Sequence, residues 1–322
     1  QYHYPFENKE LFDKQFPADF IAEGIDQTRG WFYSLLVIST AVKGVSPFKN
    51  VLVNELLLDK YGKKMHKSKG NAIEPFTMIE KYGADTIRFY LPYVSPIWTP
   101  IKFDEDGLKE VYSKFFNPLL NTYTFFQTYA NIDNIDPREI EIKYEDLEEI
   151  DKWLLSKYNK LVKYVTDAYE EYDLTRVVRS ITEFVSEDLS NWYIRRNRRR
   201  FWAHDLDNSK KAVYQTTYDV LVGITKLIAP VVPFISEEIY TSLTEKESVH
   251  LAKFPKYDEK LINEEIEEKM DLVRSLISIP AGMSEMNIPK FLIYTTIGSL
   301  IWNSVFSNFY SFLFLFWICD NA

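Results

Sequence analysis

Among the residues of this sequence, the lysines of one short loop have the types and the spacing that best fit a catalytic role. Residues 64–71 read Lys-Met-His-Lys-Ser-Lys-Gly-Asn and follow an apolar run at 51–58, which predicts a buried strand. At the end of such a strand, Lys64 and Lys67 could swing over a triphosphate and neutralise the charge that develops as a phosphorus–oxygen bond breaks. The alternative is a solvated basic turn, the usual fate of a short lysine cluster.

Polar residues ahead of the loop form a second candidate site. Residues 20–27 predict a strand that ends in polar side chains, and a helix is predicted from about 28 to 44. Glu23, Asp26 and Gln27 would then lie at the carboxyl end of a strand beside a helix N-terminus, where open parallel sheets bind nucleotides. Carboxylates at that place suit ribose hydroxyls and ammonium groups rather than phosphate.

Trp31 is the large apolar residue beside these polar side chains. An exposed Trp at such a place can wall an apolar pocket for part of a ligand. The structural alternative makes Asp26 and Thr28 helix caps and buries Trp31 in the core. The residues themselves leave both interpretations open.

Together the two segments resemble the class I aminoacyl-tRNA synthetases. The run at 23–33, Glu-Gly-Ile-Asp-Gln-Thr-Arg-Gly-Trp-Phe-Tyr, is similar to the isoleucyl enzymes in particular, and the lysine loop to the family's Lys-Met-Ser-Lys-Ser signature. The resemblance covers about residues 4–274. It implies ATP-dependent activation of isoleucine and transfer to tRNA(Ile), with Mg2+ accompanying ATP, by an enzyme that is monomeric.

The resemblance also implies roles for individual residues. Residues expected to contact the aminoacyl-adenylate or ATP are Glu23, Gly24, Asp26, Gln27 and Lys67. Gln27 and Trp31 are expected to line the isoleucine pocket. Lys64 and Lys67 are expected to act in catalysis.

Three departures from the family pattern qualify this expectation. His66 stands where the family has Ser, and a larger, mostly neutral imidazole predicts a weakened loop, not an inactive one. The family's His-Ile-Gly-His element and its inserted editing domain are not found in the sequence. Since the chain begins at Gln1, we expect it to be truncated at the front and inactive alone.

Composition fits an enzyme with two cores of ordinary size. The 322 residues carry a net charge of −9, which argues against a general nucleic-acid coat. The single Cys, Cys319, excludes an intrachain disulfide and a cysteine-based zinc site. We therefore expect a cytoplasmic protein that binds neither zinc nor another metal through its own side chains.

Two domains and a tail are predicted along the chain. Residues 1–106 predict an α/β nucleotide-binding (Rossmann-like) half-domain, and residues 107–272 an α-helical bundle that resembles the family's anticodon-binding domain. Apolar periodicity predicts helices at 76–91, 108–129 with a kink or break at Pro118, 150–170, 174–200, 210–228 and 234–243. Residues 131–149 predict a linker or surface loop.

An arginine cluster is the segment of the predicted bundle best suited to RNA. Five arginines fall within six positions, too many for packing alone: Arg195, Arg196, Arg198, Arg199 and Arg200. Guanidinium groups bind phosphates and stack on unpaired bases, and exposed Trp or Tyr could join them. The alternative is a solvated helix end paired with Glu183, Glu187 and Asp188. Trp192 is expected to be core.

The last fifty residues differ from the rest. Residues 291–319 contain no charged side chain and are long enough for a membrane span, for which about 20 residues suffice. Residues 274–302 resemble a DedA-type integral membrane protein, so 273–322 is predicted to be a foreign, apolar helical tail with possible membrane contact. Rival hypotheses for the whole chain are a non-catalytic tRNA-binding module, a membrane-tethered fusion and a synthetase of different specificity.

Overall fold

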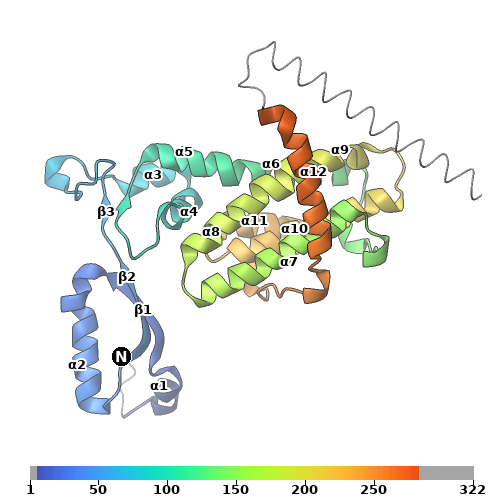
Figure 1. Ribbon diagram of the computed structural model, residues 1–322. Coiled ribbons are helices and arrows are strands. Elements are labelled where there is room, and N and C mark those ends of the chain that lie inside the picture. Colours follow the sequence, from blue (N-terminus) through green and yellow to red (C-terminus); the bar gives the residue numbers. More distant parts are fainter. Residues whose placement is uncertain (1–5, 283–322) are drawn as a thin grey trace, which may run out of the picture. The chain divides into compact units, whose positions relative to one another are not determined.

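Residues 6–282 of the computed structural model are described here, without the side chains of Lys67 and of residues 277–282 (Figure 1). The chain divides into two compact units, one up to Ile262 and one from Asn263. The first unit contains the α/β elements and the helical bundle. Helix α12 (Glu264–Gly282) belongs to the second unit, and each unit is described by itself.

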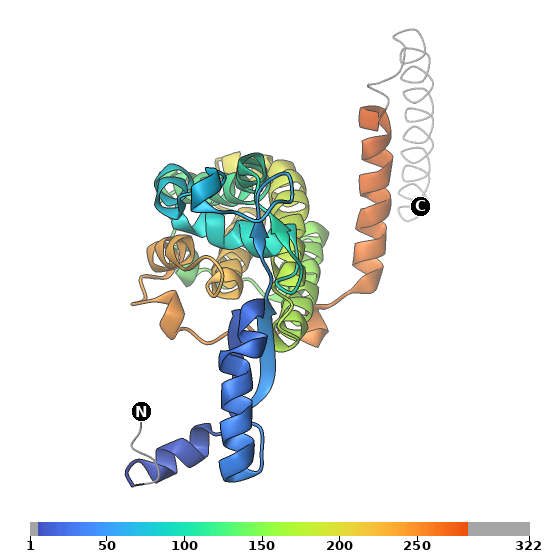
Figure 2. The ribbon, with the colours of Figure 1, turned by 90° about the vertical axis from the view of Figure 1, so that its left-hand side faces the viewer.

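A parallel strand pair forms the predicted α/β segment. Helix α1 (Lys9–Gln15) precedes strand β1 (Ala18–Gly24), which pairs in parallel with β2 (Phe48–Asn54) from Ala18 opposite Phe48 to Gly24 opposite Asn54. Helix α2 (Trp31–Lys43) connects the two strands and lies alongside them (Figures 1 and 2). It ends at Gly44, whose positive φ of 74° is a common helix stop. This βαβ unit matches the predicted arrangement.

The prediction of one buried strand at 51–58 was wrong in two respects. The run is divided into β2 and β3 (Leu57–Leu58), because the chain changes partner between them. The N–H of Glu55 donates to the Ile97 carbonyl at 2.9 Å, and β3 pairs in parallel with β4 (Ile101–Lys102). β2 is also largely exposed rather than buried.

Two of the predicted helices are irregular, one through a break and one through a change of helix type. The predicted helix at 76–91 is two helices, α3 (Pro75–Tyr82) and α4 (Ala84–Val94), separated by Gly83 with φ 82°. The helix predicted at 108–129 begins as α5 (Glu105–Val111), passes through a π-helical turn at Tyr112–Phe116 and continues as α6 (Asn117–Ile132). Pro118 lies in the first turn of α6, directly after this π-helical turn, in which the Asn117 N–H donates to the Tyr112 carbonyl. The chain therefore changes helix type at the predicted place and does not break.

The remaining helices form a bundle around a dense core. They are α7 (Glu149–Glu170), α8 (Leu174–Glu183), α9 (Arg195–Trp202), α10 (Asn208–Ile228) and α11 (Pro233–Thr244). A π-helical stretch, Phe184–Ile194, makes α8 and α9 one continuous rod, as predicted for 174–200. Helix α7 packs against α8 and α10, and α10 packs against α11. Short 3₁₀ turns at Pro137–Glu139 and Tyr144–Asp146 occupy the predicted linker.

Side-chain bonds attach α4 to the bundle. The Arg88 guanidinium donates to the Val231 carbonyl at 2.9 Å and to the Pro230 carbonyl at 3.2 Å, in the turn between α10 and α11. One turn earlier on α4, Asp85 Oδ2 accepts the N–H of Ile235 at 2.7 Å. These bonds fix α4, and with it the segment that follows the lysine loop, on the helices of the bundle.

The predicted tail lies mostly outside the described residues. Helix α12 is continuous across the predicted boundary at 272–273. None of the helices within residues 6–282 combines the length and the apolar composition that crossing a bilayer requires. The expected membrane-type segment at 291–319 is not among these residues, nor is Cys319.

Candidate functional site

A 3₁₀ turn at the end of β1 carries the predicted adenylate residues. The turn, Ile25–Arg29, leaves the sheet directly after Gly24, which is paired with Asn54 at the end of β2. Glu23 and Asp26 are exposed and Gln27 is half-buried. Gln27 Nε2 donates to Asp26 Oδ2 at 2.9 Å, and Gln27 Oε1 accepts the N–H of Trp31 at 3.0 Å. Gln27 therefore orients the Asp26 carboxylate and caps the first turn of α2.

Two glycines make room for these side chains. A Cβ on Gly24 would lie 2.7 Å from Asp26 Oδ1, and a Cβ on Gly30 would lie 2.8 Å from Gln27 Oε1. Any other residue at either place would displace the neighbouring side chain. The two glycines thus leave the space that the Asp26 carboxylate and the Gln27 amide occupy.

Trp31 faces solvent. Its side chain is 44% exposed and its ring lies 6.0 Å from that of Phe32, which is buried. The alternative that placed Trp31 in the core was therefore wrong for the described structure. The cap of α2 is also Gln27 rather than Asp26 or Thr28, whose hydroxyl donates to the Ile25 carbonyl inside the turn. A Gln four residues before a helical Trp is a weak signal, and sequence reasoning gave it no capping role.

The lysine loop follows a tight turn built on Asp59. An antiparallel bridge joins Leu58 to Lys64, and the N–H of Asp59 donates to the Lys63 carbonyl at 2.9 Å. Gly62 takes φ 78° inside this turn. A short 3₁₀ helix, Lys67–Lys69, follows, and Gly70 with φ 66° ends the loop. The side chain of Lys64 is exposed, so its ammonium group is free to approach an anion.

Asn71 closes the loop, and sequence reasoning missed this role. Its side chain bonds to Asp59, to the Lys64 carbonyl and to the His66 N–H. A cavity of about 420 Å³ lies beside this junction, lined by Asp59, Tyr61, Asn71, Met78 and Phe103 among others. The signals available beforehand were an Asp three residues before a turn Gly and an Asn directly after a Gly, both typical of side chains that bond local backbone.

The arginine cluster divides into exposed and buried members. Arg195, Arg198 and Arg199 are exposed, and within the described residues none of them has an ion-pair partner. Arg196 is exposed too and stacks over the half-buried Trp192 ring at 4.6 Å, so Trp192 is not fully core. Trp202, at the end of α9, is 55% exposed.

Arg200 differs from its neighbours. Its side chain is 12% exposed and makes a bidentate pair with Asp151, at 2.7 Å from Nη1 to Oδ1 and 2.8 Å from Nη2 to Oδ2. Asp151 is fully buried and also accepts the Tyr193 hydroxyl at 2.6 Å. Arg200 is therefore a structural residue, which corrects its assignment to RNA contact. The acids proposed as partners of the cluster, Glu183, Glu187 and Asp188, do not pair with Arg200, and Asp188 lies 3.7 Å from Lys157.

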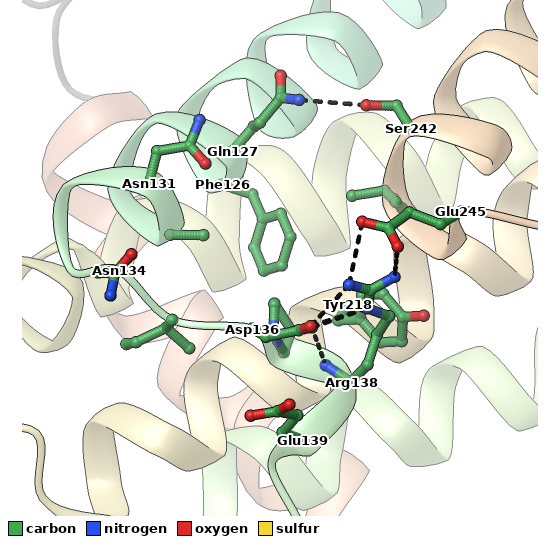
Figure 3. A pocket seen from close by; sticks show the side chains of 14 residues that line it. Phe126, Gln127, Asn131, Asn134, Asp136, Arg138, Glu139, Tyr218, Ser242 and Glu245 are labelled. Carbon is green, nitrogen blue, oxygen red and sulfur yellow. Dashed lines mark hydrogen bonds and ion pairs between the residues drawn. The ribbon is translucent and has the colours of Figure 1, made fainter.

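A second cavity, of about 470 Å³, opens between α6, α10 and α11 (Figure 3). Its arginine, Arg138, is paired with Asp136 at 2.7 Å and with Glu245 at 2.7 Å. Both pairs hold the pKa values of the two carboxyls below their ordinary range through hydrogen bonds from Arg138. With its only guanidinium neutralised twice, this cavity does not suit a phosphate. Among residues 6–282 no group of His, Cys, Asp and Glu is placed to share a metal ion.

Two family models match the chain. Residues 1–104 match "tRNA synthetases class I (I, L, M and V)" and residues 151–285 match "Anticodon-binding domain of tRNA ligase". The second match extends past residue 274, where the DedA-type resemblance was expected to begin, and that resemblance gains no support.

Curated relatives extend these matches. The chain is 48% identical over 285 residues to the isoleucine--tRNA ligase of Cytophaga hutchinsonii and 49% identical over 282 residues to that of Porphyromonas gingivalis. Each alignment covers 87% of this chain but only 26% and 25% of the relative. The chain thus spans about a quarter of the length of the curated relatives it matches.

Solved structures share the fold. A complex of an Agrobacterium radiobacter LeuRS with tRNA and LeuAMS matches 80% of this chain and 31% of its own, with a TM-score of 0.64 and 20% identity. A Mycobacterium tuberculosis methionyl-tRNA synthetase with methionyl-adenylate matches 74% of this chain and 46% of its own, with a TM-score of 0.61 and 20% identity. At that identity these two likenesses concern the fold alone.

Proposed function

This chain belongs to the class I tRNA synthetases as a partial sequence of the isoleucine--tRNA ligase type, and we propose that it supplies part of an enzyme that charges tRNA(Ile) with isoleucine. The parent reaction would have two steps. ATP and isoleucine form isoleucyl-adenylate and pyrophosphate, and the isoleucyl group then passes to a terminal ribose hydroxyl of the tRNA. The parent enzyme would act as a monomer.

The lysine loop would serve the first step. The α-phosphorus is attacked by the isoleucine carboxylate, and negative charge grows on the departing pyrophosphate. The exposed Lys64 ammonium, together with Lys67, would neutralise that charge as it develops, which accelerates the step because the transition state gains more than the ground state. Mg2+ bound to ATP would share the neutralisation of the phosphates.

The turn after β1 would hold the amino acid and the adenylate. Glu23 and Asp26 present exposed carboxylates at the carboxyl end of a parallel strand, where an ammonium group or ribose hydroxyls can be bound. Gln27 keeps the Asp26 carboxylate oriented through its 2.9 Å bond. The exposed ring of Trp31, one helical turn from Gln27, would form an apolar wall for the isoleucine side chain.

The exposed arginines would contact tRNA. Arg195, Arg198 and Arg199 follow one side of α9 at spacings of three and four residues and lead to the exposed Trp202. Unpaired guanidinium groups bind phosphates, and a Trp face stacks on an unpaired base. Arg196, stacked on Trp192, is held less freely but keeps its charge exposed.

The observation that carries the proposal is the lysine loop in a chain with near-half identity to isoleucine--tRNA ligases. A chimera tests it, in which this chain replaces the matching segment of the Cytophaga hutchinsonii ligase. We expect isoleucine-dependent ATP–pyrophosphate exchange that falls on the order of 10²-fold or more with Lys67→Ala. Lys63→Ala, at an exposed lysine just outside the loop, is the matched control. Exchange that prefers leucine, valine or methionine, or no exchange with isoleucine, contradicts the proposal.

A second candidate function is tRNA binding without catalysis. It is favoured by the bundle, whose core is closed by its own helices, whereas the turn after β1 is open to solvent. The full chain should bind tRNA(Ile) with an affinity that falls with salt, and Arg195→Ala/Arg198→Ala/Arg199→Ala should lower the salt slope by about one per lost phosphate contact. Lys246→Ala/Lys253→Ala/Lys256→Ala removes the same charge from exposed lysines elsewhere. An equal loss in both triple variants contradicts a specific contact by α9.

A further inference from the structure

Three hydrogen bonds from one side chain close the base of the lysine loop. Asn71 Oδ1 accepts the N–H of His66 at 2.9 Å. Asn71 Nδ2 donates to Asp59 Oδ2 at 2.8 Å and to the Lys64 carbonyl at 3.3 Å. A primary amide offers two N–H donors and one carbonyl, and here each of them is used.

The Asp59 carboxylate is engaged on both oxygens. Its Oδ2 accepts from Asn71, while its Oδ1 accepts the N–H of Tyr61 at 3.0 Å and the N–H of Lys63 at 2.8 Å. The backbone of the same residue closes the turn, since the Gly62 N–H donates to the Asp59 carbonyl at 2.8 Å. The bond from Asn71, followed by the one from the Lys63 backbone, lowers the pKa of Asp59, so the carboxylate is ionised and accepts at neutral pH.

The two side chains connect the two ends of the loop. Asp59 fixes the turn through which the chain enters, and Asn71 stands where the chain leaves. Between them lie Lys64 and Lys67, and the carbonyl of Lys64 accepts a hydrogen bond from Asn71. The entry and the exit of the loop are thus joined by the bonds that Asn71 makes to the Asp59 carboxylate and to the Lys64 carbonyl.

We propose that Asp59 and Asn71 form a latch that positions the lysine loop and sets how fast it opens. The Asp59–Asn71 latch acts through the loop and does not touch the phosphates, so both are positioning residues. Its catalytic consequence rests on the proposed function, whereas its effect on loop opening does not. The alternative is that the Asp59–Asn71 bond only stabilises the turn and has no effect on the position or the opening rate of the lysine loop.

Exchanging the two residues separates these alternatives. Asn71→Asp places a second carboxylate against Asp59, and Asp59→Asn places one amide N–H₂ against another. The double exchange Asp59→Asn/Asn71→Asp restores a donor facing an acceptor: the new amide at 59 donates to the new carboxylate at 71. That carboxylate still accepts the N–H of His66, whereas the 3.3 Å bond to Lys64 gives way to a contact between two oxygens. Asn71→Ala removes all three bonds without adding charge.

Loop opening is measured on the full chain by limited trypsin cleavage at 64, 67 and 69 and by hydrogen exchange of the His66 amide. We expect Asn71→Asp and Asn71→Ala to speed both about tenfold, as for the loss of one or two hydrogen bonds, and the double exchange to return within about threefold of the wild type. Glu80→Gln, an exposed acid on α3, is the control for charge. Cleavage sites in the bundle report whether the whole chain has unfolded.

The outcomes are distinct. Unchanged opening rates in Asn71→Asp and Asn71→Ala, or a double exchange as fast as the single variants, overturn the latch. In the chimera described above, the single variants should raise the KM for ATP and lower kcat, with recovery of both in the double exchange. If the opening rates behave as expected while the wild-type chimera shows no exchange with isoleucine, the proposed function fails and the latch stands.

Discussion

The βαβ unit with the lysine loop, residues 6–84 and called the α/β segment below, buries few apolar side chains, whereas the helical bundle buries many. Among the hydrophobic residues described from 6 to 84, Phe32 alone is buried. In the bundle, Trp153, Leu154 and Tyr193 are fully buried along with most of the large side chains. Helix α2 is strongly apolar, yet Val42 is 73% exposed. Burial of apolar surface therefore stabilises the bundle and contributes little to the segment that holds the candidate catalytic residues.

Among the described residues, those that stabilise the fold and those proposed to act in catalysis therefore lie in different parts of the chain. The turn after β1 and the lysine loop are held by side-chain bonds to local backbone, such as those of Gln27 and Asn71. The bundle is held by its core and by buried ion pairs such as Arg200 with Asp151 and Lys210 with Asp133. Changes in the bundle should therefore alter folding, whereas changes in the α/β segment should alter the loop or the site and leave unfolding nearly unchanged.

The largest effect is expected from Arg200→Ala. The substitution leaves the Asp151 carboxylate buried without its cation, which should lower the free energy of unfolding by about 3–5 kcal/mol. Denaturant unfolding of the full chain measures it. Arg199→Ala, the exposed neighbour, should change stability by less than about 0.5 kcal/mol. Equal losses in the two variants would mean that the buried ion pair contributes no more to stability than an exposed arginine does.

A matched pair of leucines tests the comparison directly. Leu154→Ala removes a fully buried side chain from α7 and should cost about 2–5 kcal/mol of unfolding free energy. Leu36→Ala removes the same atoms from α2, where the side chain is 42% exposed, and should cost under about 1 kcal/mol. Thermal unfolding followed by circular dichroism measures both. A large loss for Leu36→Ala would show that α2 is packed in solution.

The stability contributed by the attachment of α4 to the bundle should depend on pH. Burial raises the pKa of Asp85, and the bond from the Ile235 backbone only partly opposes this. A raised pKa in the folded state means that the contribution of Asp85 to stability is fully present below about pH 4, its unfolded value, and is lost as pH rises through the folded value. Asp85→Asn is free of this loss, so its stability relative to the wild type should increase from pH 4 to pH 7.

The control for Asp85→Asn is another acid-to-amide change. Glu80→Gln lies on the neighbouring helix and is exposed, so the difference between it and the wild type should not vary with pH. Unfolding in urea at several pH values measures both variants. A pH-independent difference for Asp85→Asn would show that the Asp85 carboxyl titrates normally in the folded protein.

The smallest effect concerns His66. The imidazole replaces a hydroxyl in the loop, and only the backbone of His66 takes part in the latch. His66→Ser in the chimera should raise the rate of ATP–pyrophosphate exchange a few fold, on the order of one weak hydrogen bond, and leave unfolding unchanged. A lower exchange rate in His66→Ser would mean that the imidazole itself contributes to the reaction.

Periodicity in the sequence predicted most of the helices. Helices α7, α10 and α11 begin and end within about two residues of the predicted bounds, because each has one apolar side facing the core. The break at Gly83 and the division of β2 from β3 were not predicted. The division of β2 from β3 depends on a partner elsewhere in the chain, since β3 pairs with β4. The break at Gly83 is local, since its N–H donates to the Ile79 carbonyl at a positive φ.

The site was predicted in its residue types but not in its bonds. The turn after β1 and the lysine loop were located from strand ends and motifs. Arg200 was misassigned because its partner, Asp151, is 49 residues away and an arginine reads the same in sequence whether buried or exposed. The Asp59–Asn71 latch was missed because side-chain bonds to local backbone follow no period.

The close approach at Gly24 and Gly30 links each glycine to one neighbouring side chain during evolution. A methyl group at Gly24 would require the Asp26 carboxylate, 2.7 Å away, to shift, and one at Gly30 would require the Gln27 amide, 2.8 Å away, to shift. An alanine at either position would therefore change the orientation of Asp26 or Gln27 without removing it. A lineage that keeps both orientations is expected to keep both glycines, so that the four positions change as two linked pairs.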